Sequence, residues 1–414
     1  LNKTFKYLCK MLPLLIYSGS IFVFGQNIQI FNTSNSGLPE NTIRAITFDN
    51  SGKKIIATDY GLSIFDDFTF QNINSSNSVI SDNSIRSVIV DQSENIWIGT
   101  TSAGAYKFDG TSWTNFAPEN CNIPDHFIRT INQDITGNIW FGTVEGLAKF
   151  DGSNWTTWTL SNSGINSNNI ASILVKPNND KIIGTLNGGI IYYDDITMTE
   201  YTLLEGGIPD NSVTDIAMDD LGNLWFATPS SGFYMDNGTQ NWQVYSMSTS
   251  TIPTNGLTSI CYNPSNGNIY GGSLETGLIR FNPANGVISN FNSDNSQLPD
   301  NHITCLKTDA SGALWIGTAG GGLVKWQDPD AGITSINHSL SISPNPFEES
   351  IFVKVYDPVE IKLLDLIGNS VDFEIILEAG SSTLVPDPNL PSGVYILGIS
   401  LPDGSKKVTR IIKA

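Results

Sequence analysis

Gly137-Asn-Ile-Trp-Phe-Gly-Thr143 and Gly312-Ala-Leu-Trp-Ile-Gly-Thr318 are two copies of one phrase that returns along the 414-residue chain. Its last residue can be followed at intervals of 42 to 45 residues through Thr58, Thr100, Thr143, Thr185, Thr228, Ser273 and Thr318. A repeat of this period is typical of β-propellers, in which each blade is a four-stranded sheet. The seven copies therefore predict an all-β, seven-bladed propeller.

Each copy contains four short segments with strand character, joined by turns. The first segment, such as Ile43-Arg-Ala-Ile46, is expected to be the innermost strand, and a turn such as Asp134 to Gly137 follows it. In this turn an Asp side chain binds its own backbone and Gly accepts a positive φ. The second strand carries the repeated phrase, a glycine opens the third strand, and a segment such as Trp155-Thr-Thr-Trp158 supplies the fourth.

The two ends of the repeat region are expected to complete one blade. The last copy ends at Trp326 without a strong fourth strand, whereas Ile28-Gln-Ile-Phe31, before the first copy, matches the fourth-strand pattern. Pairing these ends removes the exposed sheet edges that an open ring would present. We therefore expect the propeller to span residues 26–328, with the N-terminal strand closing the last blade.

Composition narrows the classes of partner. The formal net charge is −19, which repels phosphate backbones and anionic lipid headgroups, so nucleic acid is not expected as a partner. Beyond residue 25 the cysteines are Cys121, Cys261 and Cys305, an odd number without metal-ligand spacing. We expect no metal and no cofactor.

Residues 1–25 have the pattern of a secretory signal peptide. Lys3, Lys6 and Lys10 precede an apolar run, and the small Gly25 stands before Gln26, where cleavage is expected. A retained anchor is the alternative, although the run is shorter than the ~20 apolar residues of a spanning helix. No transmembrane segment is expected in the mature chain.

The repeats resemble the two-component regulator propeller family. Asn211 to Thr228 and Asn301 to Thr318 match its pattern Asn-x-Val-x-x-Ile-x-x-Asp-x-x-Gly-Asn-Leu-Trp-Ile-Gly-Thr closely, and the resemblance covers about residues 27–327. It implies a propeller outside the cell that senses a ligand for a linked histidine kinase. Because no transmembrane helix or kinase follows, signalling within this one chain is not expected.

A second module is expected at residues 341–414, after a linker at 329–340. Short alternating segments there predict a small Ig-like β-sandwich. Its opening Ser343-Pro344-Asn345-Pro346, with Leu390-Pro-Ser-Gly-Val-Tyr395 and the closing Lys406 to Lys413, resembles the type A sorting domain of type IX secretion. The resemblance implies passage through the Sec route and the type IX machinery to the cell surface or the medium. An ordinary adhesive sandwich is the alternative.

Candidate ligand-binding residues lie in the loops expected on one face around the propeller axis. They are Arg44, Arg86, Arg129, Asp59, Tyr60, Glu145, Asn187, Glu275, His126 and His302. The three arginines occupy the same slot in successive copies and suit the capture of a carboxylate, sulfate or uronic acid. The simpler interpretation is that they pair with neighbouring acids and hold the blades together.

No catalytic constellation is assigned. His126 and His302 lie in nonadjacent copies, and Glu145 and Glu275 are too far apart around the ring for a confident carboxylate pair. We expect a noncatalytic, sensor-like module that binds an extracellular glycan, peptide or protein partner. The alternatives are a propeller lyase or hydrolase acting on an extracellular polymer, and a structural component of the surface layer.

Overall fold

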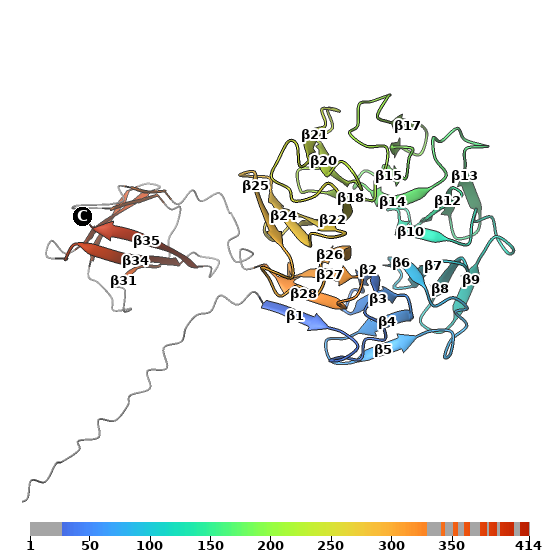
Figure 1. Ribbon diagram of the computed structural model, residues 1–414, viewed down its shortest axis with the longest axis horizontal. Coiled ribbons are helices and arrows are strands. Elements are labelled where there is room, and N and C mark those ends of the chain that lie inside the picture. The colour runs from blue at the N-terminus through green and yellow to red at the C-terminus, as the bar shows by residue number, and fades with distance from the viewer. Residues whose placement is uncertain are drawn as a thin grey trace, which may run out of the picture.

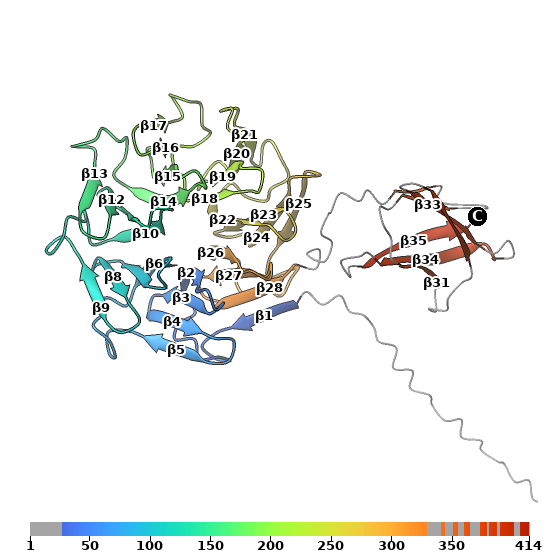
Figure 2. The ribbon, with the colours of Figure 1, turned by 180° about the vertical axis from the view of Figure 1, so that it is seen from behind.

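The computed structural model describes residues 27–328 and, towards the C-terminus, residues 341–343, 351–354, 360–364, 373–378, 381–386, 390–400 and 406–413. Residues 27–328 form seven four-stranded antiparallel sheets, arranged as the blades of a propeller around a common axis (Figures 1 and 2). The predicted signal peptide with Gly25 and Gln26, the predicted linker, and Pro344, Asn345 and Pro346 lie outside the described residues.

The strands follow one another from the axis outward in six of the blades. Blade 1 has β2 (Ile43–Phe48), β3 (Lys54–Thr58), β4 (Gly61–Phe65) and β5 (Phe70–Ile73). Blade 2 has β6 (Ile85–Val90), β7 (Ile96–Thr100), β8 (Ala105–Phe108) and β9 (Trp113–Phe116). Blade 3 has β10 (Ile128–Gln133), β11 (Ile139–Thr143), β12 (Leu147–Phe150) and β13 (Trp155–Trp158).

Blade 4 has β14 (Ile170–Val175), β15 (Lys181–Thr185), β16 (Ile190–Tyr193) and β17 (Met198–Tyr201). Blade 5 has β18 (Asp215–Met218), β19 (Leu224–Ala227), β20 (Phe233–Asp236) and β21 (Gln243–Tyr245). Blade 6 has β22 (Leu257–Asn263), β23 (Asn268–Ser273), β24 (Leu278–Asn282) and β25 (Val287–Phe291).

Blade 7 joins the two ends of the propeller, which confirms the predicted closure. Its strands are β26 (Ile303–Thr308), β27 (Leu314–Thr318) and β28 (Leu323–Gln327), with β1 (Asn27–Phe31) as the outermost. The antiparallel register runs from Asn27 opposite Gln327 to Phe31 opposite Leu323. Phe31 is buried against Phe65 of blade 1 and Trp315 of blade 7. Strand β1 therefore closes the junction between the first and last blades.

The repeated phrase forms the wall between neighbouring blades. A Cβ atom on Gly142 would lie 2.7 Å from Cγ2 of Ile170, the first residue of β14 in the next blade. The hydroxyl of Thr143, which is fully buried, donates to the carbonyl of Gly146 at 2.8 Å and fixes the turn into the third strand. Close approach of the next blade and this buried hydroxyl bond explain why Gly and Thr recur together at the end of the phrase.

Four tryptophans of the second strands are each held by an aspartate of the preceding turn. Trp140 is fully buried, and its indole N–H donates to Oδ2 of Asp134 at 2.8 Å. The same indole–carboxylate bonds measure 2.8, 3.0 and 2.8 Å and join Trp97 to Asp91, Trp225 to Asp219, and Trp315 to Asp309. Each pair ties a turn to the large side chain that fills the space between blades.

Buried lysines replace the usual apolar residue at the start of two second strands. Lys181 is fully buried, and its ammonium group donates to both carboxylate oxygens of Asp195 at 2.6 Å. The ammonium group also lies 5.1 Å from the ring centroid of Trp140 in the preceding blade. Lys54 of blade 1 repeats the arrangement with Asp67 and Trp315. These cations are parts of the blade walls because each is enclosed by an aromatic ring and a carboxylate.

The C-terminal region contains two antiparallel sheets. One has the order β29 (Ser341–Ser343), β30 (Ile351–Lys354), β33 (Ser381–Pro386) and β32 (Phe373–Glu378). The other has the order β31 (Glu360–Leu364), β34 (Gly393–Ser400) and β35 (Lys406–Lys413). Leu363, Tyr395 and Leu397 are buried, and the Tyr395 hydroxyl donates to the carbonyl of Pro391 at 2.7 Å. Packing of the two sheets as an Ig-like sandwich stays a prediction.

Candidate ligand site at the propeller axis

A β-bulge at the start of the innermost strand positions the candidate residues. In blade 1, Ile43 lies opposite Thr58 and Ala45 lies opposite Ala57, so Arg44 has no partner in the register. The same shift leaves Arg86, Arg129, Ala171, Thr258 and Thr304 without a cross-strand partner in their blades. A bulge turns one side chain away from the alternation of the strand. It is the local feature that places these side chains at the axis.

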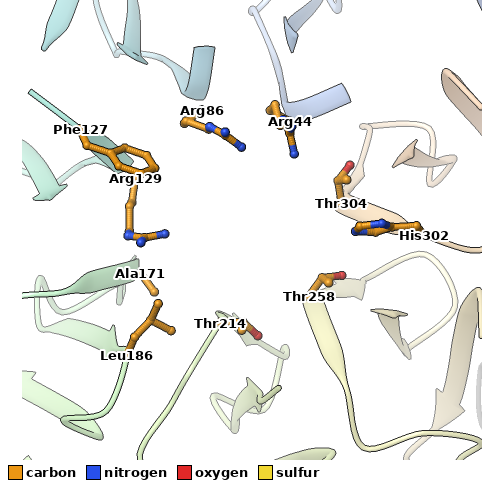
Figure 3. Close-up of a pocket in the computed structure, with 10 residues that line it drawn as sticks. All are labelled: Arg44, Arg86, Phe127, Arg129, Ala171, Leu186, Thr214, Thr258, His302 and Thr304. Atoms are coloured by element: carbon orange, nitrogen blue, oxygen red, sulfur yellow. The ribbon is translucent and has the colours of Figure 1, made fainter. Parts of the chain in front are cut away.

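The bulged residues surround a cavity of about 340 Å³ (Figure 3). The ten residues that line it are Arg44, Arg86, Phe127, Arg129, Ala171, Leu186, Thr214, Thr258, His302 and Thr304. Its wall is uneven because the arginines come from blades 1 to 3, the aliphatic residues from blade 4 and the threonines from blades 5 to 7. Figure 3 shows the three arginine side chains extending into the cavity, with His302 on the side opposite Arg129.

The three arginines have different partners. Arg44 forms an ion pair with Asp59, and its Nε donates to Asp59 Oδ1 at 2.9 Å. Arg86 donates from Nε to the hydroxyl of Thr101 at 3.2 Å. Among the described residues, neither Arg86 nor Arg129 has a carboxylate within ion-pair distance. Of these three arginines, Arg44 is thus the one that pairs with a neighbouring acid in the part of the chain that the structure describes.

Arg129 is the least satisfied of the three. Its Nε is buried without a hydrogen-bond partner among the described residues, and its guanidinium carbon lies 4.8 Å from the ring centroid of Phe127. The Arg86 guanidinium carbon lies 5.8 Å from the same centroid. One phenyl ring therefore supports two cations, and each such contact stabilises by about 0.5–2 kcal/mol depending on its exposure.

The pKa shifts show that the positive charges of the arginines lie close together. Burial, followed by the neighbouring charge of Arg86, lowers the pKa of the Arg129 guanidinium. Burial and the charge of Arg44 likewise lower the pKa of Arg86. Burial alone would raise the pKa of Asp59, but the hydrogen bond and charge of Arg44 lower it. Arginine stays protonated in proteins, so the site holds three positive charges; at Arg86 the charges of Asp59 and Asp82 partly offset the lowering of the pKa.

The threonines of the opposite arc use their hydroxyls to join blades. Thr214 donates to the carbonyl of Leu257 at 3.0 Å, and Thr258 donates to the carbonyl of Ile303 at 2.6 Å. Thr304 donates in the same way to the carbonyl of Ile43, the next blade in the ring. These hydroxyl protons are already engaged, so this arc offers a ligand little further donor capacity.

The other six predicted rim residues do not line the cavity. Asp59 is the partner of Arg44, and Tyr60 is 54% exposed on the turn beside it. His126 forms a 2.9 Å contact with Glu119 at the surface. The remaining three are exposed on loops between second and third strands: Glu145, Asn187 and Glu275. These positions stay predictions for an outer rim, whereas Arg44, Arg86, Arg129 and His302 share the cavity.

Six lining residues were not among the candidates: four occupy the arginine slot in the other blades, and the other two are Phe127 and Leu186. Phe127 stands immediately before the innermost strand, where the other copies have Thr, Ser, Asn, Ser, Gly and His. That His is His302, so the two cavity residues are equivalent in the repeat. Leu186 directly follows the last residue of the phrase, which is the position of Asp59 in blade 1. Comparing copies would have identified Phe127 but not Leu186, because Val144 and Leu274 are also apolar at the equivalent position.

Two further classes of site were searched for in the part of the chain that the structure describes. No group of three or more His, Cys, Asp or Glu side chains there is arranged to hold a metal ion. Nor does that part contain a helix with the length and apolar character needed to cross a membrane.

Two protein families match the chain. The two component regulator propeller matches at residues 207–230 and 297–320, in blades 5 and 7. The secretion system C-terminal sorting domain matches at residues 341–414. The chain therefore carries two-component regulator propeller repeats and a type IX sorting domain, as its motifs predict. A search of curated proteins found no match.

Solved structures show the same fold at low identity. The extracellular domain assigned to a hybrid two-component system of B. thetaiotaomicron has a TM-score of 0.65 at 20% identity, over 94% of this chain and 57% of that one. PorZ, a surface component of the type IX secretion system of Porphyromonas gingivalis, has a TM-score of 0.62 at 17% identity, over 93% of this chain and 61% of its own. Virginiamycin B lyase from Staphylococcus aureus has a TM-score of 0.58 at 14% identity, over 72% of this chain and 98% of its own. This chain thus spans less than two thirds of the first two proteins.

Proposed function

We propose that this chain, which joins two-component regulator propeller repeats to a type IX sorting domain, is an exported binding protein that captures an anionic extracellular ligand at the propeller axis. The ligand is a glycan, a peptide or a protein segment, and binding involves no chemical change. The observation that carries the proposal is the trio of arginines on one side of a 340 Å³ cavity, of which only Arg44 has an ion-pair partner among the described residues.

An anion at this place would relieve an unfavourable arrangement of charge. Burial lowers the pKa of both Arg86 and Arg129; the charge of Arg44 lowers the pKa of Arg86 further, and the charge of Arg86 lowers that of Arg129. A carboxylate or sulfate between them would accept charge-assisted hydrogen bonds from the two guanidinium groups. Planar guanidinium groups are the side chains best suited to two-point binding of such anions.

The composition of the cavity supports binding over catalysis. Acid–base catalysis needs groups that exchange protons near the pH of the reaction, held at a fixed distance from one another. Of the ten described residues that line the cavity, only His302 is of that kind, and none is a carboxylate or a tyrosine. A lyase or hydrolase therefore has a single candidate acid or base in this cavity and lacks the second.

A binding screen tests the proposal. The purified protein is titrated calorimetrically against anionic extracellular glycan fragments and peptides, with product analysis of every mixture. We expect at least one anion to bind, and the double variant Arg86→Gln/Arg129→Gln to weaken it by about 100-fold, the scale of two charge-assisted bonds. The matched control is Lys53→Gln/Lys176→Gln, which removes two positive charges from turns between first and second strands. Unchanged affinity in the arginine variant would overturn the proposed site, and ligand turnover would favour the lyase or hydrolase.

Export is tested separately in a host that has type IX secretion. The chain truncated after residue 340 lacks the segment that matches the sorting domain. We expect it to accumulate in the periplasm, whereas the full chain reaches the surface or the medium. Surface display of the truncated chain would contradict the proposed route.

A further inference from the structure

We infer that the ligand of the axial cavity is a carboxylate carried on an apolar body, as at the C-terminus of a peptide that ends in an aliphatic residue or in a small free carboxylic acid. This inference rests on the proposed function and names the chemical class of its ligand. The inference follows from the groups that lie beside the arginines and remain free to contact a ligand.

The apolar part of the ligand would lie next to the arginines. Ala171 and Leu186 of blade 4 line the cavity directly beside Arg129 (Figure 3). Both are partly exposed, so an apolar group placed there would remove aliphatic surface from water. The cation and the aliphatic surface are adjacent, which matches a carboxylate bound to a carbon that bears an apolar side chain.

The cavity is poorly equipped for a sugar. Sugars present many hydroxyls, which proteins bind with free amide, carboxylate and hydroxyl groups and with open aromatic faces. Here the hydroxyl protons of Thr214, Thr258 and Thr304 are given to backbone carbonyls of neighbouring blades. The described lining residues include neither an amide nor a carboxylate side chain. Phe127 is already the cation–π partner of Arg86 and Arg129.

The size and position of the cavity favour a chain end over the middle of a polymer. A volume of about 340 Å³ is near the lower end of the range of ~300–1,000 Å³ for small-molecule sites. All seven blades contribute to its wall, so the cavity is enclosed laterally and opens along the axis. A terminal group can enter such a site, whereas an extended chain would have to pass over it.

The test compares three probes on the purified protein: the peptide Gly-Gly-Ala-Leu with a free carboxylate, the same peptide amidated at its C-terminus, and a trimer of galacturonic acid. We expect the free acid to bind about 10- to 100-fold more tightly than the amide, because amidation removes the charge that the arginines recognise. A small acid, 4-methylpentanoate, shows whether the peptide backbone contributes. Binding of the free peptide with none of the small acid identifies a peptide end, and binding of both supports the shared class.

A second variant tests the apolar contact. Leu186→Asn should weaken the free peptide about tenfold, whereas Leu160→Asn, on an exposed leucine that does not line the cavity, should leave its affinity unchanged. Binding of the galacturonate trimer without the peptide would overturn the inference and leave the anion site standing. If the amide binds as tightly as the acid, or if neither the peptide nor 4-methylpentanoate binds, the inference is also overturned. If the protein binds none of the anions, the proposed function is overturned together with this inference.

Discussion

Each repeat contributes to two regions of the molecule, the wall between blades and the lining of the axial cavity, and the two regions differ in how closely the copies agree. The wall holds the same contacts from blade to blade, such as the indole–carboxylate bonds of Trp97 and Trp140. The cavity receives one bulged residue from each of six blades, and these include arginine, alanine and threonine. The same β-bulge thus presents a cationic, an apolar or a hydroxyl side chain to the cavity, depending on the blade.

This difference separates structural from functional positions. A residue that recurs in the wall is explained by the neighbouring blade, as Gly142 is by Ile170. Threonine in the bulge also has a structural role, since it links its blade to the next. Arg86 and Arg129 contact the ring of Phe127, and Arg86 donates to Thr101, but among the described residues neither has a carboxylate within ion-pair distance. A bound anion would supply that missing partner.

The largest effect on stability is expected from breaking a wall contact. Asp134 accepts from the Trp140 indole and lies 3.9 Å from the buried ammonium group of Lys181. Asp134→Ala leaves the indole N–H unsatisfied and should lower the free energy of unfolding by ~3–5 kcal/mol, as measured by denaturant titration. Asp134→Asn keeps an acceptor oxygen and should cost less. Equal losses in the two variants would contradict the role given to the hydrogen bond.

Acid should weaken the wall between the blades. Burial would raise the pKa of Asp91, Asp134 and Asp309, but hydrogen bonds from the tryptophans and turn residues outweigh it and lower each pKa. A carboxylate whose pKa is lower when folded stabilises the protein above its unfolded pKa of ~3.9, and this contribution is lost as pH falls. We expect the free energy of unfolding to decrease below about pH 4.

Unfolding curves measured from pH 7 to pH 3 check this dependence. In Asp134→Asn one of the carboxylates is absent, so the decrease between these pH values should be smaller than in the unaltered protein. An identical decrease in both proteins would show that other groups control the acid sensitivity.

A smaller loss is expected from the threonine arc. Thr258→Val keeps the shape of the side chain but removes the hydroxyl that donates to the carbonyl of Ile303 in the next blade. The free energy of unfolding should fall by ~1–2 kcal/mol, and the affinity for the ligand should stay the same. Thr251→Val, at an exposed position in the same copy, is the control and should change neither quantity. A loss of affinity in Thr258→Val would show that this arc also contacts the ligand.

The fold followed from the sequence because a propeller is determined by local repetition. The spacing of Thr143 and its equivalents predicted the blades, and the unmatched segment ending at Phe31 predicted the closure. The cavity was predictable in part: the common slot of Arg44, Arg86 and Arg129 was visible in the repeat. The bulge that turns this slot towards the axis was not, because it depends on cross-strand register.

The partners of the arginines could not be derived from the sequence alone. Asp59 was assigned to the rim as a ligand-binding residue, and the structure places it against Arg44. Acids are plentiful in the loops, and nothing in their spacing shows which arginine each one reaches. Phe127 and Leu186 were overlooked for a related reason, since a single apolar residue in a loop gives no periodic signal.

The smallest expected effect is the most informative about the cavity. Arg44 and Arg129 occupy the same slot, but Arg44 is paired with Asp59 whereas the Nε of Arg129 is buried without a partner among the described residues. Arg44→Gln removes a partly exposed ion pair and should cost up to ~1 kcal/mol. Arg129→Gln removes a charge that is repelled by Arg86, so the free energy of unfolding should stay within ~0.5 kcal/mol of the original value or rise. Denaturant titrations at low and at high salt compare the two variants directly. Because salt screens the repulsion between Arg86 and Arg129, any gain in the free energy of unfolding of Arg129→Gln should be smaller at high salt. A clear loss of stability in Arg129→Gln would mean that this arginine supports the blades, and the case for a ligand at the axis would then rest on Arg86 alone.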